Sequence, residues 1–245
     1  MTSNTIIRIL FSKFSHPAYL VKCTLLLLFF VSAATVSEAQ CPPAEPGCTP
    51  TQTFTATVNT PNYPDCNLTV TYDLRVCQGE FQIFNIRIVT GTGDCFDFIS
   101  DVLGIFFGPD PTLLNQERFL ATLIEQIETE VANQLFDAAV AAGPAILYNC
   151  NSGLNTFTAK FYRGSCVSFC VTRNSETGAI GFVPLSCGTT CCVKRTVYCL
   201  DDAGNVQVDV TVDQVIPGEC FTLPRPTCPA GSLFQSPCFE LCETN

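Results

Sequence analysis

Cysteine is the most chemically capable residue of this chain, and several copies recur at a short fixed interval. Three pairs are four residues apart: Cys166 and Cys170, Cys187 and Cys191, and Cys238 and Cys242. Clustered thiolates can hold zinc or can be oxidised to disulfides. Structural zinc sites favour the closer C-x₂-C spacing, so the four-residue interval favours disulfides.

The N-terminus carries the pattern of an export signal, which supports oxidation. Basic residues precede an uncharged stretch, 23–36, that is shorter than the roughly 20 residues needed to span a bilayer. Ser37 and Ala39 then supply the small residues of a cleavage site, so we expect residues 1–39 to be a signal peptide. Two alternatives remain open. One is an uncleaved signal anchor in which Lys22 snorkels, and the other is lipidation of Cys41.

Cleavage after Ala39 removes one of the 17 cysteines and leaves an even number. Even cysteine counts in exported chains are typical of complete pairing, so we expect up to eight disulfides, with the connectivity left open. The expected half-cystines are Cys41, Cys48, Cys66, Cys77, Cys95, Cys150, Cys166, Cys170, Cys187, Cys191, Cys192, Cys199, Cys220, Cys228, Cys238 and Cys242. Cys41 and Cys48 would close a short loop if they pair.

Three carboxylates have the spacing of a weak calcium candidate. Asp94, Asp97 and Asp101 fall on one face of an expected short helix, where oxygen ligands could hold a hard cation. Acidic residues at the start of a helix are also favoured by the helix dipole. We therefore predict capping and a solvated face, and no metal or other cofactor.

Catalysis is disfavoured by composition. The only histidine, His16, lies in the expected leader, so a Ser-His-Asp or Cys-His arrangement is excluded from the mature chain. A carboxylate pair of the glycosidase kind remains conceivable on a long helix. The acidic residues of that helix are Glu117, Glu125, Glu128, Glu130 and Asp137. Charged side chains are ordinary on helix surfaces, so we predict no catalytic site.

The elements that must position these residues follow from periodicity. Alternation over 53–58 and the β-branched, aromatic stretches 68–77 and 81–90 predict strands, with a break over 59–65 after the first. Two helices follow: a short one before Gly108, and a long one opened by Asp110-Pro111 and closed by Gly143-Pro144. We expect a break in the long helix, since some 30 residues would run about 45 Å. Further strands are predicted at 155–162, 166–172, 179–185, 192–199 and 206–215.

Together these elements predict an α+β fold of disulfide-rich antiparallel β-hairpins with a two-helix insertion at about 95–143. Three hairpins, 77–95, 170–187 and 199–220, share a plan in which cysteines bracket two strands, as if each were cross-linked on itself. We divide the chain into a signal peptide (1–39), a Cys/Pro-rich entry segment with one strand (40–65), a disulfide-stapled α+β domain (66–220) and a Cys/Pro-rich tail (221–245).

The formal net charge is −10, and the leader removes three of 12 basic but only one of 22 acidic residues. Such an acidic chain repels phosphate, so nucleic acid is a poor partner, and no stable membrane insertion is expected after cleavage. The sequence predicts a secreted or cell-surface protein, structural or adhesive and non-enzymatic. The alternatives are an extracellular ligand-binding module or protease inhibitor and, more weakly, a carboxylate-dependent hydrolase. Expected partners are an extracellular protein or glycan, or a second copy bound through helix 111–142.

Two further features are open at this level. Asn67-Leu68-Thr69 is a glycosylation sequon, relevant in a eukaryotic source. Phe96, Phe98, Phe106 and Phe107 could form an exposed docking patch, although core packing is the commoner fate of phenylalanine.

Overall fold

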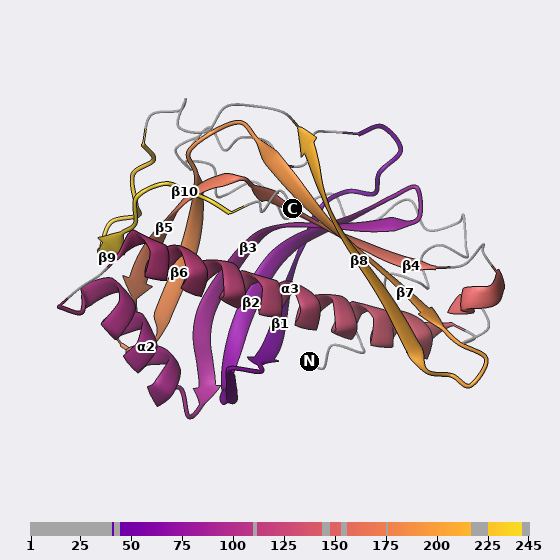
Figure 1. Cartoon of the computed structure of the whole chain (residues 1–245), viewed down its shortest axis with the longest axis horizontal. Helices are drawn as coiled ribbons and strands as arrows, with labels where there is room; N and C mark the ends of the chain where they lie inside the picture. The colour runs from indigo at the N-terminus through magenta and orange to yellow at the C-terminus, as the bar shows by residue number, and fades with distance from the viewer. Residues whose placement is uncertain are drawn as a thin grey trace, which may run out of the picture.

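The computed structural model describes residues 41, 45–109, 112–143, 148–152, 156–174, 176–216 and 225–241. The expected signal peptide, Asp110-Pro111, Pro144, Cys220 and Cys242 lie outside the described residues. One large sheet curls around a long helix, and a short helix lies at one end (Figure 1). The predicted α+β fold with a two-helix insertion is confirmed.

Ten strands and two α-helices make up the described fold. The strands are β1 (Gln52–Thr60), β2 (Tyr63–Cys77), β3 (Glu80–Gly93), β4 (Phe157–Gly164), β5 (Cys166–Arg173), β6 (Ile180–Ser186), β7 (Cys191–Leu200), β8 (Val206–Ile216), β9 (Ser232–Gln235) and β10 (Phe239–Glu240). The helices are α2 (Phe96–Phe107) and α3 (Leu113–Ala142), with a 3₁₀ turn η3 (Cys150–Ser152).

The first three strands form an antiparallel meander. Gln78 and Gly79, with φ of 53° and 86°, make the predicted tight turn between β2 and β3. The break predicted at 59–65 is shorter than expected, because Pro61 and Asn62 alone turn the chain between β1 and β2. Pro64 lies within β2 near the irregular end of the β1–β2 pairing, a position where strands tolerate proline.

The sheet is mixed, because β3 and β4 run parallel over Phe81–Ile83 and Ala159–Phe161. Parallel neighbours need a long crossover connection, and the two-helix insertion supplies it. The sequence predicted the insertion but only antiparallel pairing. The consequence is that α3 lies across the same sheet face that β3 and β4 share.

Helix α3 is continuous for 30 residues, so the predicted break is wrong. The long strands β2 and β3, of 15 and 14 residues, provide a surface against which an unbroken helix can bury its apolar stripe. That stripe, which includes Leu120, Ile124 and Val131, packs in the core. Thr112 is the N-cap of α3 in place of the predicted Asp110, because its side chain accepts the Asn115 N–H.

Six disulfides join described cysteines: Cys41–Cys191, Cys48–Cys77, Cys66–Cys95, Cys150–Cys199, Cys170–Cys228 and Cys187–Cys238. Cys166 and Cys192 are also disulfide-bonded. The tail is tied to β5 by Cys170–Cys228 and, just after β6, by Cys187–Cys238. Cys41 and Cys48 bond other cysteines, so they do not close a loop together. The prediction that the hairpins 77–95, 170–187 and 199–220 are each cross-linked on themselves is wrong. Cys77, Cys170, Cys187 and Cys199 bond other segments instead, whereas Cys66–Cys95 joins the two far ends of the β2–β3 hairpin, where Cys66 lies opposite Gly93.

Candidate functional site

A hollow opens where β3 changes its neighbour. Its first half pairs with β4 as far as Ile83, and its second half pairs with β6 from Ile88. Between these pairings Asn85 has a φ of 53°, a left-handed conformation that asparagine tolerates better than most residues. The Asn85 amide donates to the Asp73 carboxylate at 2.9 Å, which holds the kink. The strands β4 and β6 therefore separate beside the kink and leave a gap over α3.

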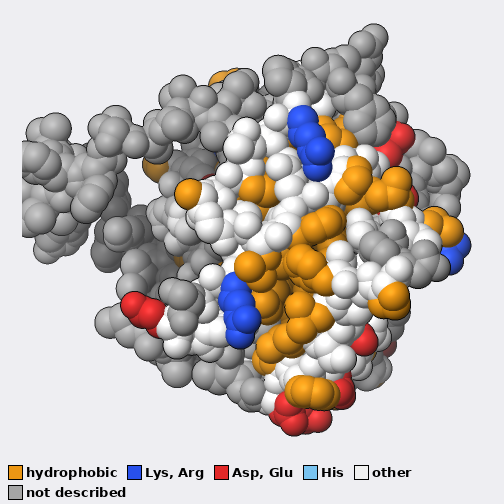
Figure 2. All heavy atoms as spheres, turned by 90° about the vertical axis from the view of Figure 1, so that its left-hand side faces the viewer, with side chains coloured by type: hydrophobic (Ala, Val, Ile, Leu, Met, Phe, Trp, Pro, Cys, Tyr) orange, Lys and Arg blue, Asp and Glu red, His pale blue; other side chains and the backbone are white. Residues whose placement is uncertain are grey.

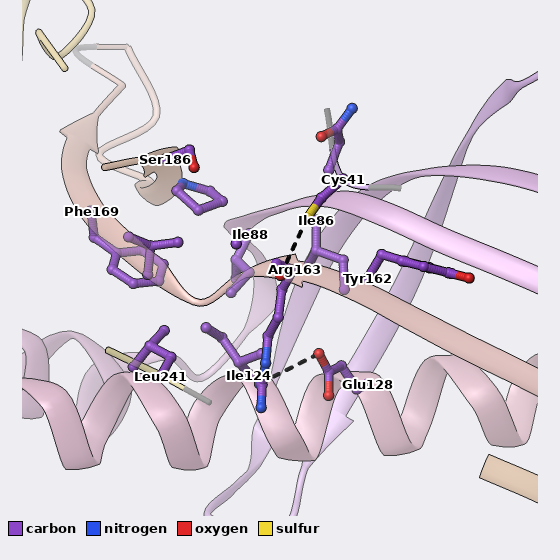
Figure 3. Close-up of a pocket in the computed structure, with 14 residues that line it drawn as sticks. Cys41, Ile86, Ile88, Ile124, Glu128, Tyr162, Arg163, Phe169, Ser186 and Leu241 are labelled. Carbon is purple, nitrogen blue, oxygen red and sulfur yellow. Dashed lines mark hydrogen bonds and ion pairs between the residues drawn. The ribbon is translucent and has the colours of Figure 1, made fainter. Parts of the chain in front are cut away.

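This gap is a pocket of about 90 Å³, closed below by α3. Most of its wall is apolar, and its polar groups come from β3, α3, β4 and β6. The lining residues are Cys41, Asn85, Ile86, Ile88, Ile124, Glu128, Tyr162, Arg163, Gly164, Val167, Phe169, Pro184, Ser186 and Leu241. Figure 3 shows the Arg163 side chain reaching from β4 down to α3, where it faces the Glu128 carboxylate.

Four charged side chains meet at this point. The Glu128 side chain is 1% exposed and lies 3.6 Å from the Arg163 guanidinium and 3.7 Å from the Lys194 ammonium. Lys194, on β7, also lies 3.9 Å from Glu125, whose side chain is 71% exposed. One buried carboxylate thus contacts two cations, and Lys194 is shared with a carboxylate in water.

The contacts of Glu128 are ion pairs without hydrogen bonds. Both of its carboxylate oxygens are buried, and neither has a hydrogen-bond partner among the described residues. Charge-assisted hydrogen bonds are normally about 2.7–2.9 Å long, so distances of 3.6 and 3.7 Å leave the oxygens without donors. A buried acceptor in this condition is unusual in a native fold.

Helical phase could have singled out Glu128 among the acidic residues of α3. It lies four residues after Ile124 and beside Ile127, on the apolar stripe, whereas Glu125 and Asp137 lie on exposed positions. Glu117 and Glu130 are half-buried. Glu125 and Glu128 share Lys194, but only Glu128 lines the pocket, so the structure does not bring a carboxylate pair together across that cavity.

Two of the three weak calcium candidates, Asp94 just before α2 and Asp101 in its second turn, engage other groups. Asp94 accepts the Phe96 N–H at 3.1 Å, and Asp101 accepts the Tyr63 hydroxyl at 2.8 Å. Burial and the Asp101 hydrogen bond raise the pKa of Tyr63. Cys95 occupies the N-cap position, which the sequence suggested for Asp94. Asp97 lies exposed in the first turn.

Ligand atoms of three candidate metal-binding residues converge within 4.8 Å at one place in the described ranges, at Glu45, Cys48 and Cys77. These two cysteines form a disulfide with each other, so no thiolate is available there. The 201–205 segment is the turn between β7 and β8. Its Asp201 carboxylate accepts the N–H groups of Ala203 and Asn205, and hydrogen bonds from Asn205 lower the pKa of Asp201.

The four phenylalanines of α2 divide between core and surface. Phe98 and Phe106 are buried, whereas Phe96 is 73% and Phe107 44% exposed. Phe96, Leu103 and Phe107 recur at spacings of seven and four and so share the outer face of α2. Phe107 also packs edge-on against Phe234 of β9, with ring centroids 5.6 Å apart.

Hydrophobic side chains gather on this end of the molecule, where α2, the start of α3 and β9 meet (Figure 2). We call this region the α2–β9 surface and define it by its exposed members, Leu103 and Phe107 of α2, Leu113 and Leu114 of α3, and Leu233 of β9. Each of the five is between 44% and 56% exposed. The sequence placed Phe107 in a possible docking patch, but the members from α3 and β9 could not be added, because these elements meet α2 only in the fold.

No helix in the described part of the chain has both the length and the apolarity to cross a bilayer. No protein-family model matches the chain, and searches of curated proteins and of solved structures give no match.

Proposed function

We propose that this chain is an exported, disulfide-stapled adhesive protein without enzymatic activity, and that the α2–β9 surface is its contact surface. The single observation that carries the proposal is the gathering of five half-exposed large aliphatic and aromatic side chains at one end of an acidic protein. Contiguous exposed apolar area of this kind is typical of interaction sites.

The rest of the fold suits such a role. Six disulfides fix the described chain in a compact arrangement and are compatible with an oxidising, extracellular medium. Cys66–Cys95 ties the beginning of α2 to β2, and Cys170–Cys228 ties the segment before β9 to β5. The elements that carry the apolar side chains are therefore held rigidly, which reduces the entropy lost on contact.

The test is adsorption of the oxidised protein to an alkyl-terminated monolayer, compared with a hydroxyl-terminated one. A variant with Leu103→Ser, Phe107→Ser and Leu233→Ser should lose most of the preference for the alkyl surface. The matched control carries Val206→Ser, Val208→Ser and Val210→Ser on β8, three residues that are about equally exposed. The control should adsorb like the parent protein.

Two results would overturn the proposal. Equal loss of adsorption in both triple variants would show that general hydrophobicity, and not this surface, is responsible. Turnover of any substrate in a hydrolase panel, lost on substitution of one acidic residue, would establish the enzymatic alternative. Circular dichroism and intact mass should first verify that each variant is folded and oxidised.

A further inference from the structure

We propose that the pocket beside Glu128 is a binding site for a small neutral molecule with a hydroxyl or amide head and a short apolar body. The head bridges Glu128 and Arg163, and the body lies among Ile88, Ile124 and Leu241. This site is separate from the α2–β9 surface, so the inference stands whether or not that surface is adhesive.

The geometry of the ion pairs argues against a purely structural tie. Where this chain ties strands together with an ion pair, Lys160 and Glu80 approach to 2.5 Å although both are partly exposed. Glu128 is almost fully buried, yet its two cations stay at 3.6 and 3.7 Å. A hydroxyl, or an amide through its N–H and its C=O, can donate to the carboxylate and accept from the guanidinium, which direct contact at these distances does not achieve.

The charges indicate a neutral head. Glu128 and Arg163 are the charged residues that line the pocket, and they balance each other, so an added ion would leave the pocket with a net charge. An ammonium head would also be placed against two cations, and a carboxylate head against the buried carboxylate. A hydroxyl or amide avoids both repulsions and supplies the donor that the Glu128 oxygens lack.

The walls and the volume of the pocket determine the apolar body of the ligand. Ile88, Ile124 and Leu241 lie beside the Arg163–Glu128 pair in Figure 3, and they present aliphatic surface. A cavity of about 90 Å³ is smaller than the roughly 150 Å³ of a cavity that holds benzene, so it suits a molecule of about four or five non-hydrogen atoms. Propionamide and 1-propanol have this size and the required head.

The experiment is a titration of the full oxidised protein followed by methyl NMR. Four probes of similar shape are compared: propionamide, 1-propanol, propionate and propylammonium. The neutral probes should give saturable shifts confined to the methyl groups of pocket residues, and the two ions should bind at least about tenfold more weakly.

Two variants locate the site. Ile124→Phe should fill the cavity and abolish the saturable shifts, whereas Leu233→Phe, an exposed control on β9, should leave them unchanged. Glu128→Gln keeps the side-chain size but replaces the charged acceptor, and should weaken propionamide binding about tenfold. If Ile124→Phe does not fold, the effect of Glu128→Gln and the comparison of the four probes still test whether the pocket binds a neutral head.

Three outcomes would overturn the proposal. These are shifts that do not saturate with any probe, equal affinity for neutral and charged probes, and undiminished binding to folded Ile124→Phe. The first of them would mean that the pocket holds internal water only. None of these outcomes bears on adsorption through the α2–β9 surface, so the two proposals fail independently.

Discussion

At the scale of the residue, burial raises the pKa of the tyrosine hydroxyls. Five of the six tyrosines follow residue 39, and burial is the largest cause of a raised pKa in each of them. The pKa values of Tyr72 and Tyr198 rise to about 12. Because a neutral phenol is favoured in the fold, the folded chain keeps protons that the unfolded chain loses above its tyrosine pKa of about 10.

We therefore predict that stability is insensitive to tyrosine ionisation below pH 10 and falls as the pH rises from about 10 through about 12. Tyrosinate absorbance at 295 nm should lag in the native protein relative to the same oxidised protein in guanidinium. Tyr72→Phe removes one buried phenol and should make the decline in unfolding free energy shallower. Coincident native and denatured titration curves would refute this prediction.

The residues of the pocket show which properties of a single residue can be predicted from the sequence. The position of Glu128 on the buried face of α3 follows from its spacing to Ile124, so its burial was predictable. Its partners were not, because Arg163 and Lys194 come from β4 and β7, which neighbour α3 only after the sheet curls. The kink at Asn85 that opens the pocket depends in the same way on β3 having two different neighbours.

At the scale of the element, the threonine at the N-terminus of α3 and the threonine in its middle should have opposite effects on stability. The Thr112 hydroxyl accepts the Asn115 N–H at the N-terminus, where the backbone lacks partners. The Thr129 hydroxyl, in the exposed middle of the helix, donates to the Glu125 carbonyl, which already accepts a backbone hydrogen bond in a regular helix. The same substitution should therefore change stability in opposite directions.

We expect Thr112→Ala to lower the unfolding free energy by about 1 kcal/mol, since it removes a cap. Thr129→Ala should raise it by up to about 0.5 kcal/mol, since alanine has the higher helix propensity. Urea unfolding of the oxidised variants, with equal m-values, measures both changes. A loss of stability in both variants, or in neither, would contradict the assignment of Thr112 as the cap.

Elements were predictable where their signal is local. Alternation over 53–58 identified β1, and the spacing of Leu120, Ile124 and Val131 identified α3. The unbroken length of α3 was not predictable, because it depends on the length of the sheet that it crosses. The short strands β9 and β10 were not predicted for a similar reason. Their extended conformation depends on pairing with β5, and their few residues carry no strand pattern of their own.

At the scale of the whole molecule, the disulfides join segments that are distant in the sequence and that the sheet brings close together. Their sequence separations run from 29 to 150 residues, and the longest joins Cys41 to β7. Long loops restrict the unfolded chain most, at roughly 3–5 kcal/mol per bridge in the loop-entropy account. The disulfide connectivity was unpredictable from the sequence, because the partner of each cysteine depends on which strands are neighbours in the sheet and not on spacing along the chain.

Exposure predicts the order in which these bridges open. Cys66 and Cys95 are 1% and 8% exposed, whereas Cys150 and Cys199 are both half-buried. Reduction requires access of the reductant to a sulfur, so Cys150–Cys199 should open while the fold is intact, and Cys66–Cys95 only when the core unfolds. Stepwise treatment with a phosphine, alkylation and peptide mass mapping will record the order. Labelling of Cys66 and Cys95 first, or of any of the 14 bonded cysteines before reductant is added, would contradict the arrangement described above.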